Sequence, residues 1–232
     1  MRLSTREWGS GDRTAALVHG IMSDSRTWRR VGPALAERGY RVVAVDLRGH
    51  GGSPRGSYDL EDYADDLVET LPAGAELVIG HSLGGLALAG AVERLAPRRA
   101  VYLDPAWRHA ALGAGFAPSQ FPRFAARATP GMVAALNPRW DPADVRIEME
   151  TMALWDPASA EGLTPLAGRV VLPVRAAAPS LVLTADPSRL VTPEDVEVLR
   201  GRGFEVRTVP GAGHSIHRDD FDGFITALEG WI

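Results

Sequence analysis

Short runs of valine and leucine recur along this chain, and longer segments with helical periodicity separate them. Each run shows little polar alternation, which is typical of strands buried on both faces of a parallel sheet. Because such strands alternate with helices, the sequence predicts a doubly wound, mostly parallel α/β sheet. The predicted strands are 14–20, 41–46, 76–80, 100–104, 180–185 and 205–210.

Local signals place helices between these strands. Gly39 is a suitable stop for the first helix, and Thr192 followed by Pro193 is typical of the start of a later one. The segment 83–95 is apolar nearly all round, so we expect that helix to be buried. The predicted helices are 25–38, 59–71, 83–95, 193–200 and 217–231.

The alternation stops at a proline-rich insertion, residues 105–170, which reads as short helices with no convincing strand. A long insertion into a regular α/β fold is often an active-site lid. The sequence therefore predicts a core made of residues 1–104 and 171–232 and a helical lid at 105–170. The alternative is that the insertion forms extra surface helices packed on the core.

The segment Gly80-His81-Ser82-Leu83-Gly84 follows a predicted buried strand and opens the apolar helix. It fits the pattern G-x-S-x-G, in which a sharp strand-to-helix bend exposes the serine. Flanking side chains would collide with the strand and the helix, which explains the glycines. The helix N-terminus also favours an anion beside the serine. Ser82 is therefore the candidate nucleophile.

A serine hydroxyl is a poor nucleophile without a base. Of the six histidines, His214 is the best placed, because it lies in a glycine-rich loop between the last predicted strand and the final helix. We expect His217 at the first turn of that helix, on the surface.

The base needs a carboxylate that fixes its tautomer. Asp186 follows the predicted strand 180–185 and is the preferred candidate, because the chain order is then Ser82, Asp186, His214. Asp104 also ends a strand and competes for this role, or it holds the start of the lid.

The tetrahedral intermediate of acyl transfer needs hydrogen-bond donors for its oxyanion. One candidate is the backbone N–H of Leu83, directly after the serine. The second is the N–H of Ile21, because His19 and Gly20 follow the first predicted strand. By itself, this His-Gly pair also fits a plain turn.

Together these segments resemble an α/β-hydrolase-fold protein with a helical lid. The resemblance implies Ser82 as nucleophile, His214 as base and Asp186 as the residue that orients the base, at a site without a cofactor. It covers nearly the whole chain outside 105–170. The matching segments are LVHGIMSDSRTWRRVGPAL, YRVVAVDLRGHGGSPRG, LVIGHSLGGLAL, LVLTADPSRLVTPE and VPGAGHSIHRDDFDGFI.

The resemblance also bears on two segments near the N-terminus. In the loop after the second predicted strand, it implies that Asp46, Arg48 and His50 hold the chain rather than react. It further implies that the family's N-terminal hairpin is short here, with RLSTREW supplying only one or two edge strands.

Many reactions occur on this fold, so the fold alone does not settle the chemistry. Epoxide hydrolases and haloalkane dehalogenases resemble the chain but use an aspartate where it has Ser82. The absence of lysine argues against hydroxynitrile-lyase-like sites. We therefore expect hydrolysis of a carboxylic ester or lactone through an acyl-enzyme. The alternatives are a thioesterase, a C–C bond hydrolase or lyase on the same triad, and a non-catalytic ligand-binding protein.

Aromatic residues are enriched in the predicted lid, which is compatible with a small to medium apolar substrate. The charged residues Arg108, His109 and Arg123 in this segment are expected to be solvated rather than to form an anion site. Possible pocket residues, which fit core packing as well, are Met22, Trp28, His81, Trp107, Trp140 and Trp155.

Composition excludes several other classes of protein. The 232 residues include no cysteine, which excludes disulfides, thiolate metal sites and a cysteine nucleophile. The formal net charge of −4 gives no reason to expect nucleic acid or a membrane as partner. We expect neither metal nor other cofactor, no signal peptide and no transmembrane segment, and hence a cytoplasmic protein that acts on a small molecule.

Overall fold

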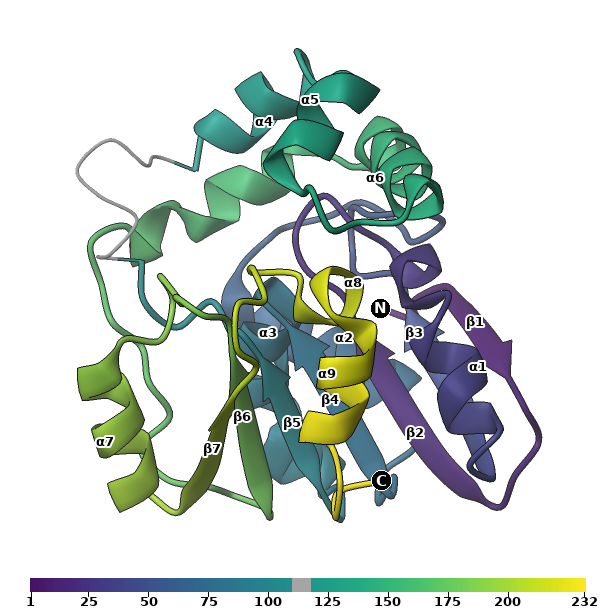
Figure 1. Ribbon diagram of the computed structural model, residues 1–232, viewed down its shortest axis with the longest axis vertical. Coiled ribbons are helices and arrows are strands. Elements are labelled where there is room, and N and C mark those ends of the chain that lie inside the picture. The colour runs from purple at the N-terminus through teal and green to yellow at the C-terminus, as the bar shows by residue number, and fades with distance from the viewer. Residues whose placement is uncertain (110–117) are drawn as a thin grey trace.

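A seven-stranded sheet forms the centre of the protein (Figure 1). The computed structural model describes residues 1–109 and 118–232. Its strands are β1 (Thr5–Trp8), β2 (Arg13–Val18), β3 (Tyr40–Val45), β4 (Leu77–His81), β5 (Ala100–Leu103), β6 (Ser180–Thr184) and β7 (Phe204–Thr208). Their order is β1-β3-β2-β4-β5-β6-β7, with β1 antiparallel to β3 and all other neighbours parallel. This confirms the predicted α/β fold, and β1 is the expected edge strand.

Helices cover both faces of the sheet. The core helices are α1 (Val31–Ala36), α2 (Leu60–Thr70), α3 (Leu83–Leu95), α7 (Pro193–Gly201), α8 (Ile216–Asp219) and α9 (Phe221–Ala227). In β2, Ala16 and Val18 belong to a hydrophobic cluster with side chains of α2, α3 and α7, whereas Ala15 and Leu17 pack with those of α1 and α9. Because alternate residues are buried on opposite faces, the strand reads as a continuous apolar run.

Two of the predicted helices are interrupted. The segment 25–38 forms a 3-10 turn, η1 (Ser25–Trp28), and then α1. Pro33 lacks an N–H group and its ring would clash within a continuous helix, but it is tolerated in the first turn of a new one. The final segment divides at Asp220, whose side chain accepts the Gly223 N–H and caps α9. Within the described residues, we find no helix that is both long and apolar enough to cross a membrane.

The insertion between β5 and β6 forms helices that lie over one end of the sheet (Figure 1). They are α4 (Gln120–Ala125), α5 (Pro130–Leu136), α6 (Pro142–Leu154) and the 3-10 helix η2 (Pro157–Leu166). Residues 110–117 of the predicted lid lie outside the described residues. Arginines of the core attach α6 through ion pairs, which are Arg26–Glu150, Arg29–Asp144 and Arg218–Glu148.

The loop after β3 is held by its own polar side chains. Asp46 accepts the N–H groups of Ser25 and Gly52 at 2.8 and 2.9 Å. The buried His50 ring donates from Nδ1 to the Arg48 carbonyl at 2.8 Å. These contacts hold the chain, as the resemblance implied for Asp46 and His50.

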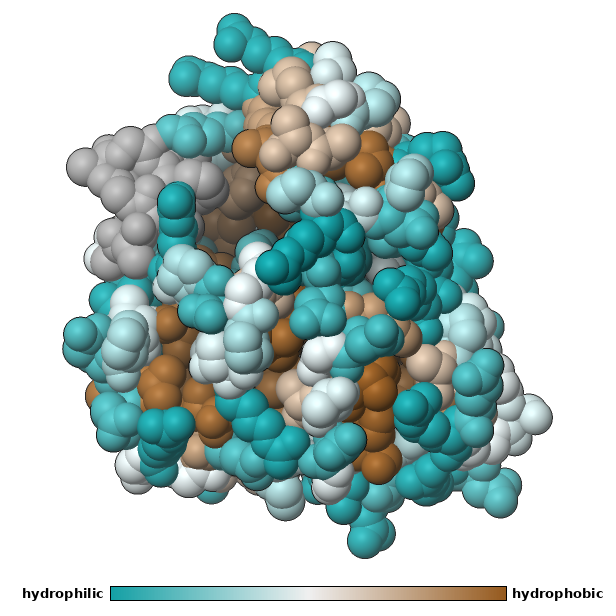
Figure 2. Space-filling view, in the orientation of Figure 1, coloured by the Kyte–Doolittle hydropathy of each residue, from teal (hydrophilic) through white to brown (hydrophobic). Residues whose placement is uncertain are grey.

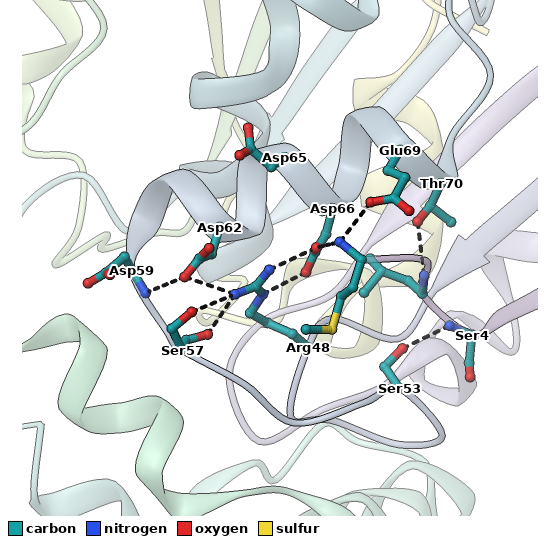
Figure 3. A network of polar contacts seen from close by, with 12 residues as sticks. Ser4, Arg48, Ser53, Ser57, Asp59, Asp62, Asp65, Asp66, Glu69 and Thr70 are labelled. Atoms are coloured by element: carbon teal, nitrogen blue, oxygen red, sulfur yellow. Dashed lines mark hydrogen bonds and ion pairs between the residues drawn. The ribbon is translucent and has the colours of Figure 1, made fainter.

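Arg48 in the same loop is buried against α2 (Figure 3). Its Nε and Nη2 donate to the two carboxylate oxygens of Asp66 at 2.6 and 2.8 Å, and Nη1 donates to the Ser57 carbonyl at 2.7 Å. The amino group of Met1 contacts Asp66 as well. Two further carboxylates of α2 contact the same cations, since Asp62 pairs with Arg48 at 2.9 Å and Glu69 pairs with the Met1 amino group at 2.8 Å. Asp66 therefore lies at the centre of a network that ties the loop and the N-terminal segment to α2.

We expect Asp66→Ala to lower the free energy of unfolding by about 2–3 kcal/mol, because it removes the buried carboxylate that accepts two hydrogen bonds from Arg48, although Asp62 still pairs with that guanidinium. The matched control is Asp65→Ala on the same helix. Asp65 pairs with Arg94, and both side chains are about half exposed or more (61% and 48%), so we expect a loss below about 1 kcal/mol. Urea unfolding measures both changes, and equal losses would contradict the role given to Asp66.

Candidate active site

Ser82 stands at a sharp bend between β4 and α3. Its backbone angles, φ 51° and ψ −115°, lie outside the helical and strand regions. A Cβ atom at Gly80 would lie 2.5 Å from the Gly84 carbonyl oxygen, and one at Gly84 would lie 2.4 Å from the Val18 carbonyl oxygen. Both positions therefore require glycine. This is the strand–turn–helix context that the G-x-S-x-G pattern predicts.

The carboxylate that faces His214 belongs to Asp104. His214 Nδ1 donates to Asp104 Oδ2 at 2.6 Å. Asp104 directly follows β5, which pairs with β4, the strand that leads to Ser82. The Asp104 side chain is buried, whereas that of His214 is about half exposed. Because Nδ1 carries the proton of this hydrogen bond, Nε2 is the ring atom that can accept one.

The second oxygen of Asp104 is held as well. Oδ1 accepts a hydrogen bond from Ser188 Oγ at 2.6 Å and one from the Ala185 N–H at 3.3 Å. The backbone of Asp104 has a φ of 38°, a conformation that side chains rarely adopt. Such strain persists where surrounding contacts determine the conformation, and it gathers at functional sites.

The structure corrects the expectation that Asp186 orients His214. Asp186 is exposed, and its Oδ2 accepts the Gly211 N–H at 3.0 Å. Both aspartates follow neighbouring parallel strands, β5 and β6, so the strand pattern points to each of them. Asp186 contributes to the turn at Gly211, and Asp104 occupies the place beside His214. The sequence had indicated Asp104 as the competing candidate, because it also follows a predicted strand.

Buried rings support the loop that carries His214. His81 Nε2 donates to the His214 carbonyl at 3.0 Å, and the two rings lie 4.7 Å apart. The His217 ring lies 5.2 Å from that of His81 and stacks on Trp28 at 4.4 Å. Burial lowers the pKa of both His81 and His217 well below the ordinary value, so both rings are neutral at pH 7. The surface position expected for His217 is therefore wrong, because α8 turns this ring inward between Trp28 and His81.

The loop after β2 lies directly against Ser82. A Cβ atom at Gly20 would lie 3.1 Å from Ser82 Cβ, so this close approach depends on a glycine. The buried His19 ring fixes the loop, since Nδ1 donates to the Gly20 carbonyl at 2.7 Å and Nε2 accepts a backbone N–H at 2.9 Å. Ile21 and Leu83 line the same cavity as Ser82. Neither backbone N–H of these two donates to any acceptor in the described residues.

A cavity of about 420 Å³ contains Ser82, Asp104 and His214 in its wall. Figure 2 shows a hollow with hydrophobic walls beneath the helices of the insertion. The remaining lining is mainly apolar and includes Ile21, Leu83, Phe121, Leu163, Pro187 and Leu190.

The residues proposed for the pocket divide into two groups. Met22 and His81 line the cavity. The four tryptophans pack elsewhere in the described structure: Trp28 and Trp107 belong to the clusters beside the sheet, and Trp140 and Trp155 pack within the insertion. Their apolar surface is used in packing between elements, so they are not part of the described cavity wall.

A buried ion pair also lines the cavity, and sequence reasoning missed it. Arg218 of α8 donates from Nη1 to Glu148 of α6 at 2.7 Å and from Nη2 to Ser23 Oγ at 3.3 Å. It thereby joins the His214 loop, the insertion and the loop after β2. No local pattern predicts such a pair, because its members lie 70 residues apart in the chain.

The charged residues predicted to be solvated have different surroundings. Arg108 donates to Asp195 at the start of α7 at 2.6 Å, because that buried carboxylate needs a partner, so the expectation of a solvated side chain is wrong there. His109 lines the cavity, while Arg123 is exposed as expected. Among the described residues, no cluster of three or more histidine, aspartate and glutamate side chains is arranged to hold a metal ion.

Comparison with known proteins assigns this chain to a family. The model of the alpha/beta hydrolase family matches residues 16–227. The chain belongs to the alpha/beta hydrolase family. The match spans the segments that carry Ser82, Asp104 and His214, together with the insertion. It confirms the family that the sequence motifs indicated.

Curated relatives of this alpha/beta hydrolase are similar to it over shorter segments. A 2-(acetamidomethylene)succinate hydrolase of Mesorhizobium japonicum is 42% identical over 87 residues, which are 35% of this chain and 31% of that protein. A probable esterase of Oryza sativa is 36% identical over 91 residues, which are 36% of this chain and 35% of that protein. The chain thus spans about a third of the length of the curated relatives it matches.

The likeness to solved structures extends over nearly the whole chain. The crystal structure of an E-2-(acetamidomethylene)succinate hydrolase has a TM-score of 0.75 to this structure at 25% identity, covering 99% of this chain and 94% of that one. This likeness shows the alpha/beta hydrolase fold over nearly the whole chain.

Proposed function

We propose that this alpha/beta hydrolase cleaves a carboxylic ester or lactone through an acyl-enzyme on Ser82. The observation that carries the proposal is that Ser82, His214 and Asp104 line one cavity, with His214 Nδ1 bonded to Asp104 Oδ2 at 2.6 Å. A nucleophile beside a base that a third group orients is the signature of nucleophilic catalysis.

In the proposed acylation step, Ser82 Oγ attacks the substrate carbonyl carbon while His214 Nε2 takes the hydroxyl proton. Asp104 keeps the other ring proton on Nδ1 and stabilises the imidazolium. When the carbon–oxygen bond of the tetrahedral intermediate breaks, Nε2 gives its proton to the leaving alcohol. Water then attacks the acyl-enzyme by the same route, and the carboxylic acid leaves.

The oxyanion is assigned to the backbone N–H groups of Ile21 and Leu83. Both residues line the cavity beside Ser82, and the N–H of Leu83 is at the N-terminus of α3, where the helix dipole favours negative charge. The proton of an N–H group held by rigid backbone needs no reorganisation as charge develops. The buried, neutral His19 supports this arrangement by fixing the loop at Gly20.

The lining of the cavity supports a small or medium apolar substrate. Its volume of about 420 Å³ suits a small-molecule site. We assign the described part of the insertion, residues 105–109 and 118–170, the role of a lid that covers this cavity. Because three ion pairs attach α6 to the core, this part of the lid acts as a fixed wall.

Hydrolysis of an acyl C–N bond is the second candidate. The relative that is 42% identical over 87 residues is named for the hydrolysis of 2-(acetamidomethylene)succinate, a compound with an acetamido group. Ser82, His214 and Asp104 would have the same roles in this reaction, except that His214 would protonate a leaving nitrogen instead of an oxygen.

Labelling and turnover together test the proposal. We expect a fluorophosphonate to form an adduct on Ser82, which mass spectrometry of peptides would locate. The kcat/KM values for 4-nitrophenyl esters, lactones and N-acyl compounds then show which class of bond the protein cleaves best. Heat-denatured protein is the control, because the reaction depends on the folded site. A folded protein that shows neither adduct nor turnover would contradict the proposal and favour a ligand-binding role.

A further inference from the structure

Arg189 lines the cavity from the loop that holds Asp104. The residue before it, Ser188, donates to Asp104 Oδ1 at 2.6 Å. Ser188 Oγ also accepts the N–H groups of Leu190 and Val191 at 3.1 and 2.9 Å. These bonds fix the backbone on both sides of Arg189, and they therefore fix the position of its Cα atom in the cavity wall.

The other charged side chains in the cavity wall have charged or hydrogen-bonding partners. Asp104 is bonded to His214, and Glu148 is bonded to Arg218 at 2.7 Å. Arg189 forms no hydrogen bond or ion pair with any residue of the ranges 1–109 and 118–232. The sequence of the intervening segment, AALGAGFA, contains no acidic side chain. The cavity therefore has one cation whose charge no carboxylate of the described chain balances.

The chemistry of this cation points to one kind of ligand. A guanidinium presents parallel N–H donors that match the two oxygens of a carboxylate. Pro187 and Leu190 are apolar cavity residues on either side of Arg189 in the chain. The Arg189 side chain is exposed, so its donors stay accessible to an anion that enters the cavity from solvent.

We infer that Arg189 is a specificity-determining residue that binds a carboxylate at the far end of the substrate. The inference rests on the proposed ester hydrolysis and narrows its substrate class to monoesters of dicarboxylic acids or comparable anionic esters. The apolar lining fits the methylene chain, and Arg189 fits the charge at its end.

Two esters of equal chain length test this inference, namely 4-nitrophenyl hexanoate and the mono-4-nitrophenyl ester of adipic acid. We expect the wild-type protein to prefer the adipate ester. In Arg189→Gln, the ratio of the two kcat/KM values should fall up to about fivefold through a higher KM for the adipate ester, since an ion pair with an exposed arginine is weaker than a buried one. Arg189→Lys should keep part of the preference, because it retains the charge without the parallel donors.

Arg98→Gln is the matched control, because it removes the same charge from another exposed position, which precedes β5 and lies at the opposite end of that strand from Asp104. An unchanged ester ratio in Arg189→Gln, or an equal change in Arg98→Gln, would overturn the inference. Where ester turnover is too slow to measure, protection of Ser82 against the fluorophosphonate by monomethyl adipate and methyl hexanoate gives the ratio of their affinities instead. Failure of the proposed function gives a different result from failure of this inference, because Ser82 of the wild-type protein would then form no adduct with the fluorophosphonate.

Discussion

Replacement of Asp104 by asparagine is expected to lower kcat about 10⁴-fold with little change in the fold. Asparagine has nearly the same shape, but it lacks the negative charge that stabilises the imidazolium of His214. Its amide N–H₂ group can also donate to Nδ1, which would place the ring proton on Nε2 and remove the base. Steady-state kinetics with a 4-nitrophenyl ester measures the loss, and urea unfolding checks that the variant is folded.

Asp186→Asn is the matched control for this experiment. Asp186 is exposed, and the amide oxygen of asparagine can still accept the Gly211 N–H, so we expect kcat to change less than about twofold. A large loss in Asp186→Asn with near-normal activity in Asp104→Asn would return the role of the acid to Asp186. Equal large losses would show that the turn at Gly211 is needed to place His214.

Ser82→Ala is expected to lower kcat about 10⁶-fold, because the remaining groups of a triad have no nucleophile to activate. The fluorophosphonate adduct should disappear as well. Alanine keeps the Cβ atom, so the substitution does not relieve the backbone conformation at φ 51° and should leave the fold unchanged. Kinetics and peptide mass spectrometry give the two readouts on the same preparation.

Ser215→Ala is the control for Ser82→Ala, since Ser215 is another serine in the cavity wall and lies next to His214. We expect it to keep the adduct and to change kcat by less than about twofold. Residual activity near the wild-type level in Ser82→Ala would mean that another group attacks the substrate, and the acyl-enzyme mechanism would be wrong.

Much of this fold follows from local patterns. Strands such as β4 are buried on both faces, so their composition alone distinguishes them from surface segments. The bend at Ser82 is equally readable, because a Cβ atom at Gly80 or Gly84 would collide with a carbonyl oxygen. The breaks within the predicted helices at 25–38 and 217–231 were less apparent, because their apolar periodicity continues across the break.

The cavity wall was the least predictable part of the site. The tryptophans have large apolar surfaces that suit a pocket or a core equally well, and the packing of the whole chain placed them in the core and the insertion. Arg218 and Glu148 meet across a long separation in sequence, as do Arg108 and Asp195. Pairs of this kind depend on how distant segments pack together, which no periodicity encodes.

By itself, the sequence determined the α/β architecture, the sharp bend at Ser82 and the loop that carries His214, because local sterics and burial dictate these features. Only the tertiary structure decided which carboxylate faces His214. Asp104 and Asp186 follow adjacent parallel strands and are equivalent in any local pattern. The choice depends on the direction in which the chain leaves each strand, since a hydrogen bond of 2.6 Å forms with only one of them.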